Sequence, residues 1–256
     1  LQFYFLSYIK KIRKNKNNLK LINLDNLFAK SGLEKNYDLR NYYVIRSRLS
    51  ILGLKNLSNS IFSELKVYKK KKVLLLDCDN TLWGGVVAED GLEKIQIKND
   101  GLGLAYYEFQ KAIKKIKDSG ILIALVSKNN KNDVENVFNN HDSMYLKSED
   151  ITCSKVNWVD KSKNIIEIAK ELNLDLNSFV YWDDNPIERD KVRINLKDVT
   201  VFEPDEDVAK WPLQLLEYEG FSKFETTKSD KLKSKQYKQR SRSVSYTHLT
   251  LPTTPY

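Results

Sequence analysis

Short, continuous apolar runs recur along the middle of the chain, and each is bounded by charged or turn-forming residues. The five runs are residues 73–77 (VLLLD), 121–127 (ILIALVS), 143–147 (SMYLK), 179–183 (FVYWD) and 199–202 (VTVF). Their β-branched and aromatic content, with little polar alternation, is typical of strands that are buried on both faces. The pattern therefore predicts five strands.

Two longer segments between these runs have the apolar period of an amphipathic helix. Residues 104–120 (LAYYEFQKAIKKIKDSG) carry one apolar stripe and stop at a glycine, and residues 160–174 (DKSKNIIEIAKELNL) have the same period. Strands that alternate with helices form βαβ units with right-handed crossovers. We therefore expect an α/β fold, a three-layer sandwich around a central parallel sheet.

The two ends of the chain do not follow this pattern. Residues 19–70 read as a strand, an irregular stretch and a helix, too short for a domain, so we interpret 1–69 as the end of a truncated upstream domain. Residues 70–205 then form the α/β domain, and 206–242 form a helical, lysine-rich linker. The tail, 243–256 (SVSYTHLTLPTTPY), contains no lysine and resembles a translated sequencing adapter, so we expect it to be non-native.

Acidic and hydroxyl side chains stand where the predicted strands end. Asp77 ends the first run and Asp79 follows it, Ser127 ends the second, and Asp183 and Asp184 end a later one. The carboxyl ends of parallel strands meet at one edge of a sheet, which is where such folds place their ligands. Four carboxylates gathered there repel one another unless a hard cation joins them, and oxygen-only ligation indicates Mg²⁺.

Magnesium beside an accessible carboxylate is typical of phosphoryl transfer. In this interpretation Asp77 attacks phosphorus and forms an aspartyl-phosphate, and Asp79 protonates the leaving oxygen and later activates water. Ser127 offers a hydroxyl to the phosphoryl oxygens. Lys161 lies on the apolar face of its helix and in the first turn, where a cation opposes the helix dipole, and a phosphate at the sheet edge would explain its place.

This ordered set of residues resembles the four motifs of the haloacid dehalogenase (HAD) superfamily. The stretches LDCDNTLWGGVVAEDGLEKI, VSKNN, NWVDKSKNI and DDNPIER resemble in particular its FkbH-like branch (subfamily IIIC), and the resemblance covers about residues 20–240. One departure is Ala88, where the branch leads us to expect glycine. The resemblance implies a HAD-type Rossmann-like sandwich with a small flap hairpin, residues 82–97, as its lid and no large cap domain.

The resemblance also implies roles for individual residues. Asp77 and Asp79 would be catalytic, and Thr81, with Ser127 and Lys161, would bind phosphate. The metal would be held by Asp77, Asp79, Asp183 and Asp184. The sequence does not decide between Asp183 and Asp184 as the direct ligand; we favour Asp184, with Asp183 in the outer shell.

Members of the branch remove phosphate from 1,3-bisphosphoglycerate and load the glyceryl unit onto the phosphopantetheine arm of an acyl carrier protein. We expect such a small acyl phosphate and such a carrier as partners. The same residues would also serve a stand-alone phosphomonoesterase acting on a metabolite or sugar phosphate, and a non-catalytic scaffold domain is a second alternative. The upstream segment resembles the end of an SGNH-hydrolase-like domain, and the linker resembles one that leads to an acetyltransferase-like domain.

Cys78 lies between the two catalytic aspartates, where a thioester relay to a thiol carrier is conceivable. Strand alternation, however, points its side chain away from the face that Asp77 and Asp79 share, which favours a buried, inert thiol. The sequence does not decide the role of Cys153 either.

Composition excludes several other classes of function. The formal net charge is +9, but the lysines are spread along the chain, so we expect no nucleic-acid partner. The two cysteines form no disulfide framework, which favours a cytoplasmic location, and the two histidines are too few for a histidine-based metal site or triad. The apolar N-terminal stretch is too short to span a bilayer, so we expect no membrane role.

Overall fold

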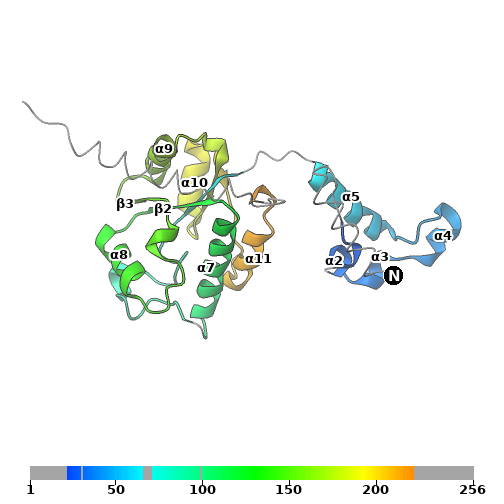
Figure 1. The fold of residues 1–256 in the computed structure, drawn as a ribbon, viewed down its shortest axis with the longest axis horizontal. Helices are drawn as coiled ribbons and strands as arrows, with labels where there is room; N and C mark the ends of the chain where they lie inside the picture. Colours follow the sequence, from blue (N-terminus) through cyan, green and yellow to red (C-terminus); the bar gives the residue numbers. More distant parts are fainter. Residues whose placement is uncertain (1–21, 30, 66–70, 99, 222–256) are drawn as a thin grey trace, which may run out of the picture. The chain divides into compact units, whose positions relative to one another are not determined.

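The computed structural model describes residues 22–29, 31–65, 71–98 and 100–221. The chain divides into two compact units, Leu1–Tyr68 and Lys69–Tyr256 (Figure 1).

The described part of the first unit is helical. Its helices are α2 (Leu24–Ala29), α3 (Leu33–Asn36), α4 (Leu39–Ile45) and α5 (Ile51–Leu65). Gly53 in α5 lies against the carbonyl oxygen of Asn36, which a Cβ atom at this position would approach to 2.3 Å. The predicted irregular stretch is thus occupied by short helices, and α5 corresponds to the predicted helix. The predicted strand lies largely outside the described residues.

A five-stranded, wholly parallel sheet forms the centre of the second unit. Its order is β3-β2-β1-β4-β5, so β1 is central. The strands are β1 (Val73–Leu76), β2 (Leu122–Ser127), β3 (Cys153–Val156), β4 (Phe179–Trp182) and β5 (Thr200–Val201). Every residue of β1, β2 and β4 is buried, as expected for inner strands of a sheet covered on both faces.

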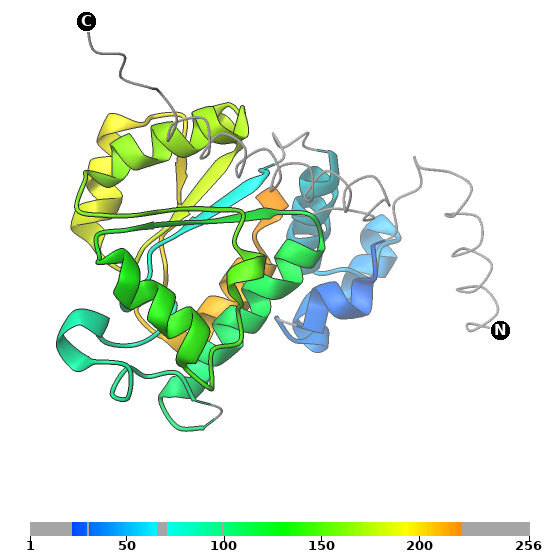
Figure 2. The ribbon, with the colours of Figure 1, turned by 60° about the vertical axis from the view of Figure 1, so that its left-hand side comes forward.

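Helices cover both faces of this sheet. They are α6 (Val87–Asp90), α7 (Gly103–Asp118), α8 (Lys131–Asn140), α9 (Lys161–Leu172), α10 (Pro186–Asn195) and α11 (Trp211–Leu216), with 3-10 turns η1 (Ser148–Asp150), η2 (Leu176–Ser178), η3 (Val208–Lys210) and η4 (Glu219–Phe221). Leu74 and Leu76 pack with α7, α8 and α11, and Val73 and Leu75 pack with α9 and α10. Figure 2 shows the strands between these two helical layers. The expected α/β three-layer fold is confirmed.

One predicted strand is wrong. Residues 143–147 form no strand, and the edge strand is instead β3, ten residues further along the chain. The backbone N–H groups of Tyr145 and Leu146 donate to the side-chain oxygen of Gln110, which lies in α7, at 2.9 and 3.1 Å. Met144 and Leu146 are buried in the core, so the apolar run reflects packing beneath a loop rather than a strand.

The flap is smaller than a two-stranded hairpin. Its arms pair only at Gly84 and Gln96, which exchange two backbone hydrogen bonds, and α6 occupies the loop between them. Among the described residues between β1 and α7 there is this flap and no cap domain. No helix in the described part of the chain is both long and apolar enough to cross a bilayer.

Candidate active site

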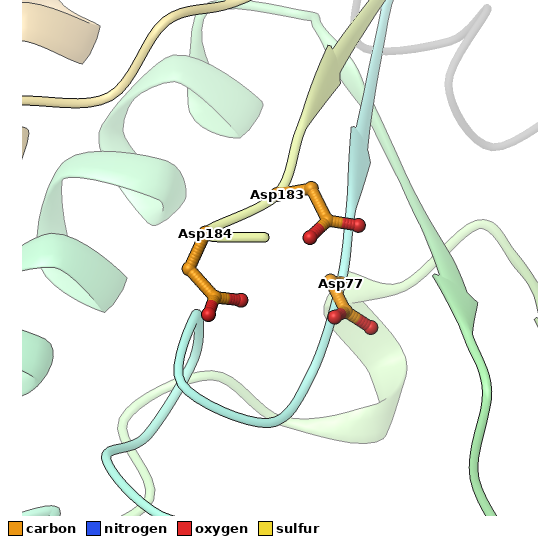
Figure 3. A group of neighbouring side chains, drawn as sticks. All are labelled: Asp77, Asp183 and Asp184. Atoms are coloured by element: carbon orange, nitrogen blue, oxygen red, sulfur yellow. The ribbon is translucent and has the colours of Figure 1, made fainter. Parts of the chain in front are cut away.

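Three carboxylates meet at the carboxyl edge of the sheet. Asp77 directly follows β1, and Asp183 and Asp184 directly follow the neighbouring strand β4. The N–H of Asp77 donates to the carbonyl oxygen of Trp182 at 3.1 Å, which fixes the two strand ends in register. One oxygen from each of the three carboxylates lies within 4.8 Å of the others, and Figure 3 shows the side chains facing a common space.

Asp77 is the acid at the centre of this arrangement. Its side chain is buried, and its Oδ2 lies 2.9 Å from the ammonium nitrogen of Lys161. Its Oδ1 is buried and has no hydrogen-bond partner. Burial raises the pKa of Asp77 to about 6; the charge of Lys161 and the nearby Ser127 hydroxyl oppose this shift, and the charge of Asp183 adds to it.

Lys161 is the cation of the site. It is the first residue of α9, is 3% exposed, and lies between Asp77 and Asp183, whose Oδ2 is 2.6 Å from its ammonium nitrogen. Burial lowers the pKa of Lys161, but the charges of the two carboxylates outweigh burial, and the net shift is upward. The lysine therefore remains charged, and its place in the first helical turn is explained by the acids it faces.

Asp183 and Asp184 differ in how many protein donors they already hold. Asp183 accepts hydrogen bonds from Lys161, from the hydroxyl of Tyr181 and, at 2.9 Å, from the N–H of Asn185. Asp184 accepts one from the hydroxyl of Thr81 at 3.2 Å and is half-buried. Burial and the charge of Asp183 raise the pKa of Asp184.

Thr81 lies at the edge of the acidic cluster and contacts Asp184. Its side chain is fully buried, and its hydroxyl both donates to the carboxylate of Asp184 and accepts from the Asp184 N–H at 3.3 Å. Its hydroxyl thus orients a carboxylate rather than facing open space. The predicted contact between Thr81 and phosphate stays a prediction.

Asp79 stands apart from the three clustered acids and is bound to the flap. Its Oδ1 accepts hydrogen bonds from the indole of Trp83 (2.8 Å) and the N–H of Val87 (3.0 Å). Its Oδ2 accepts from the amide of Asn129, at 2.7 Å. Asn80 adopts a left-handed conformation (φ 53°), which turns the chain back toward the flap. Asp79 is therefore positioned by the flap and by the loop after β2 together.

Sequence reasoning missed Asn129. Its side chain is buried beside Asp79, two residues after Ser127, which ends β2 and is buried beside Asp77. The available signal was the stretch VSKNN, in which polar residues directly follow a predicted strand. A polar side chain that is buried at such a strand end needs a hydrogen-bond partner at the same edge of the sheet.

The two cysteines are buried, free thiols. Cys78 is fully buried in the core on the α7 side of the sheet, and burial with the charge of Asp77 raises its pKa well above the ordinary range. Burial also raises the pKa of Cys153. Neither thiol is poised to ionise, and the acyl-relay role of Cys78 stays a prediction that this geometry does not favour.

The donor set fits a hard divalent cation. The buried Oδ1 of Asp77 has no partner, and an unpaired carboxylate oxygen in a buried site is costly. The neighbouring acids supply further oxygens, and no thiolate or imidazole belongs to the cluster. All-oxygen ligation of this kind is what Mg²⁺ prefers in proteins.

Comparison with known proteins agrees with this geometry. No family model matches the chain, and no curated protein matches it. Among solved structures, the N-terminal part of the protein BF1531 from Bacteroides fragilis contains a phosphatase domain and was determined in complex with Mg. It matches with 37% sequence identity and a TM-score of 0.72 over 84% of this chain and 59% of that chain. This chain therefore shares the α/β fold of that structure, a five-stranded parallel sheet flanked by helices, and it spans less than two thirds of the matched chain.

Proposed function

We propose that this chain is a magnesium-dependent, HAD-type phosphohydrolase or phosphotransferase with Asp77 as its nucleophile. The observation that carries the proposal is the unpartnered, buried Oδ1 of Asp77, which lies among two further carboxylates and one buried lysine. The similarity to a phosphatase domain in complex with Mg supports it.

The chain's own residues can be assigned to two chemical steps. Asp77 attacks phosphorus and forms an acyl phosphate, while the bond to the leaving oxygen breaks and Asp79 gives that oxygen a proton. Asp79 then removes a proton from water, which attacks phosphorus and releases Asp77. Lys161 and Ser127 stabilise the phosphoryl oxygens throughout.

The metal would be held by Asp77 and Asp184, with Asp183 behind them. The protein donors that already occupy Asp183 support this division. When bound, Mg²⁺ supplies positive charge that lets the acids ionise together and neutralises the phosphoryl group.

We further propose that the substrate is a small acyl phosphate resembling 1,3-bisphosphoglycerate. Asp77 takes the phosphoryl group of its phosphate ester, and the phosphopantetheine thiol of an acyl carrier protein attacks the carbon of its acyl phosphate, which forms the thioester and releases inorganic phosphate. Four motif stretches that resemble the FkbH-like branch support this, as does a flap too small to enclose a bulky carrier-borne group. A phosphomonoesterase acting on a free metabolite would use the same residues.

Intact-protein mass spectrometry separates these activities. The chain is mixed with Mg²⁺, 1,3-bisphosphoglycerate and a holo carrier protein, beside the same mixture with Asp77→Asn. A glyceryl-sized mass gain on the carrier that is lost in the variant supports acyl loading. Phosphate release with an unmodified carrier supports a phosphatase, and equal phosphate release by both proteins would make the domain a scaffold and overturn the proposal.

A further inference from the structure

The charges assigned to the site so far do not balance a phosphoryl dianion. With Asp79 holding the proton that it donates, the carboxylates of Asp77, Asp183 and Asp184, the ammonium of Lys161 and one divalent cation together carry no net charge. A phosphate monoester or acyl phosphate adds two negative charges. Because like charges a few ångströms apart repel strongly where water is scarce, binding requires a further cation nearby.

Lys128 is placed to be that cation. It directly follows Ser127 at the end of β2, and its ammonium nitrogen lies 3.0 Å from Oε1 of Glu188 in the first turn of α10. Since β1 lies between β2 and β4, this ion pair joins the loops on either side of the strand that ends at Asp77.

Glu188 is an unusual partner for a surface lysine. It is 8% exposed, and its second oxygen, Oε2, is buried without a hydrogen-bond partner. It lies in the first turn of α10, four residues after Asp184, and the charge of Lys161 contributes to lowering its pKa. Burial raises that pKa, but hydrogen bonds from Lys191 and Lys128 outweigh burial, so the carboxylate remains ionised. A buried, half-satisfied carboxylate is costly to stability, which calls for another reason for its presence.

Two other cations lie nearby, but one already donates to several acceptors and the other is more exposed to solvent. Arg189 donates to the backbone carbonyls of Asp183 and Asp184, at 2.9 and 2.7 Å, and pairs with Glu203. It shapes the loop after β4. Lys191 lies 2.8 Å from the same oxygen of Glu188, but its side chain is 45% exposed and it extends from the body of α10.

We infer that Lys128 is a second cationic ligand of the substrate's phosphoryl group and that Glu188 is the positioning residue that holds it at the edge of the site. The inference rests on the proposed function. An ammonium group has three donors, so Lys128 can keep its bond to Glu188 while it donates to a phosphoryl oxygen. Glu188 prevents the lysine from extending into solvent before substrate arrives.

The test is equilibrium binding of inorganic phosphate to the full chain in saturating Mg²⁺, measured by titration calorimetry. Lys128→Ala is expected to weaken phosphate binding about tenfold, which corresponds to the loss of one charge-assisted hydrogen bond. Lys191→Ala removes an equal charge from the same Glu188 oxygen and is the matched control; we expect a change within about twofold. Lys128→Arg should restore most of the affinity, which excludes a simple folding defect.

The positioning role of Glu188 has a separate readout. Glu188→Gln keeps the shape of the side chain but not its charge, so we expect a higher KM for the phosphorylated substrate with kcat changed less than about twofold. Equal effects of Lys128→Ala and Lys191→Ala, or wild-type phosphate affinity in Lys128→Ala, would overturn the inference.

Failure of this inference can be told apart from failure of the proposed function. If no substrate is turned over but phosphate binding falls in Lys128→Ala alone, the catalytic proposal fails and Lys128 still binds phosphate. If turnover depends on Asp77 while Lys128→Ala binds phosphate normally, the catalytic proposal stands and the inference about Lys128 fails.

Discussion

Asp77 carries a charge that the folded chain does not favour. Its pKa of about 6 means that the folded protein binds a proton at this carboxyl more tightly than the unfolded chain, in which the ordinary value is 3.8. The stability that this group contributes is therefore present below about pH 4 and is lost as the pH rises through 6. The residue that lowers the stability of the fold is thus the proposed nucleophile itself, as is common where function opposes stability.

Asp77→Asn should consequently stabilise the metal-free chain at neutral pH while abolishing phosphate release. The pKa shift corresponds to about 1–3 kcal/mol, which thermal unfolding in chelator can detect. The control is Lys161→Met, which leaves the two buried carboxylates unpaired and should destabilise by about 3–5 kcal/mol. A melting temperature that falls in Asp77→Asn would contradict this account of the site.

Metal affinity should depend steeply on pH near the pKa of Asp77. A proton competes with the cation for this carboxyl, so the affinity for Mg²⁺ should be constant well above pH 6 and fall about tenfold for each pH unit below it. The raised pKa of Asp184 steepens the fall. Calorimetric titrations at pH 7.5, 6 and 5 measure the slope, and a flat profile would exclude Asp77 from the metal's ligands.

At the scale of elements, the side chain of Gln110 decides that the segment before η1 is a loop rather than a strand. Gln110 is fully buried in α7, donates to the carbonyl of Leu82 at 2.7 Å and accepts from two backbone N–H groups of the 144–146 loop. It thereby joins the helix to the start of the flap and to the loop that sequence analysis took for a strand. Periodicity does not report such a partner, because the donor and acceptor are more than thirty residues apart.

Gln110→Leu should destabilise the chain by about 2–4 kcal/mol, because it leaves a buried carbonyl, a buried N–H group and a partly buried N–H group without partners. Lys115→Leu, an exposed change on the same helix, should shift the free energy of unfolding by less than about 0.5 kcal/mol. Urea unfolding of both variants provides the comparison, and equal midpoints would show that Gln110 does not hold the loop.

The flap offers a second test at this scale. Gly85 has a φ of 96°, and a Cβ atom there would lie 2.6 Å from the Asp90 oxygen that accepts the Val86 N–H. Gly85→Ala should therefore displace α6 and with it the Val87 N–H that holds Asp79.

We expect kcat of Gly85→Ala to fall about tenfold, the lower end of the usual contribution of general acid–base catalysis. Gly91→Ala is the matched control, because Gly91 also has a positive φ (74°) but a Cβ atom there meets nothing within 4 Å. Similar kcat values in the two variants would show that the position of the flap does not affect the chemical step.

At the scale of the whole molecule, the second unit contains a complete core. Two hydrophobic clusters, one on each face of the sheet, lie entirely within the described residues of this unit. A chain that begins at Lys69 should therefore unfold in one cooperative transition and bind Mg²⁺ as tightly as the full chain. Far-UV circular dichroism and calorimetry test both statements. Broad, non-cooperative melting would mean that the first unit is needed for the fold.

The sequence by itself determined four of the five strands, the helices α7 and α9 and the meeting of Asp77, Asp183 and Asp184, because each depends on a local pattern and on the geometry of parallel strands. Asp77 and Lys161 were also found this way, since one ends a strand and the other begins a helix. Only the tertiary structure decided that Asp79 belongs to the flap, that Thr81 holds Asp184, that Gln110 binds the loop and that Lys128 faces Glu188. Those pairings join residues distant in sequence, and which donor reaches a given acceptor depends on how the layers pack.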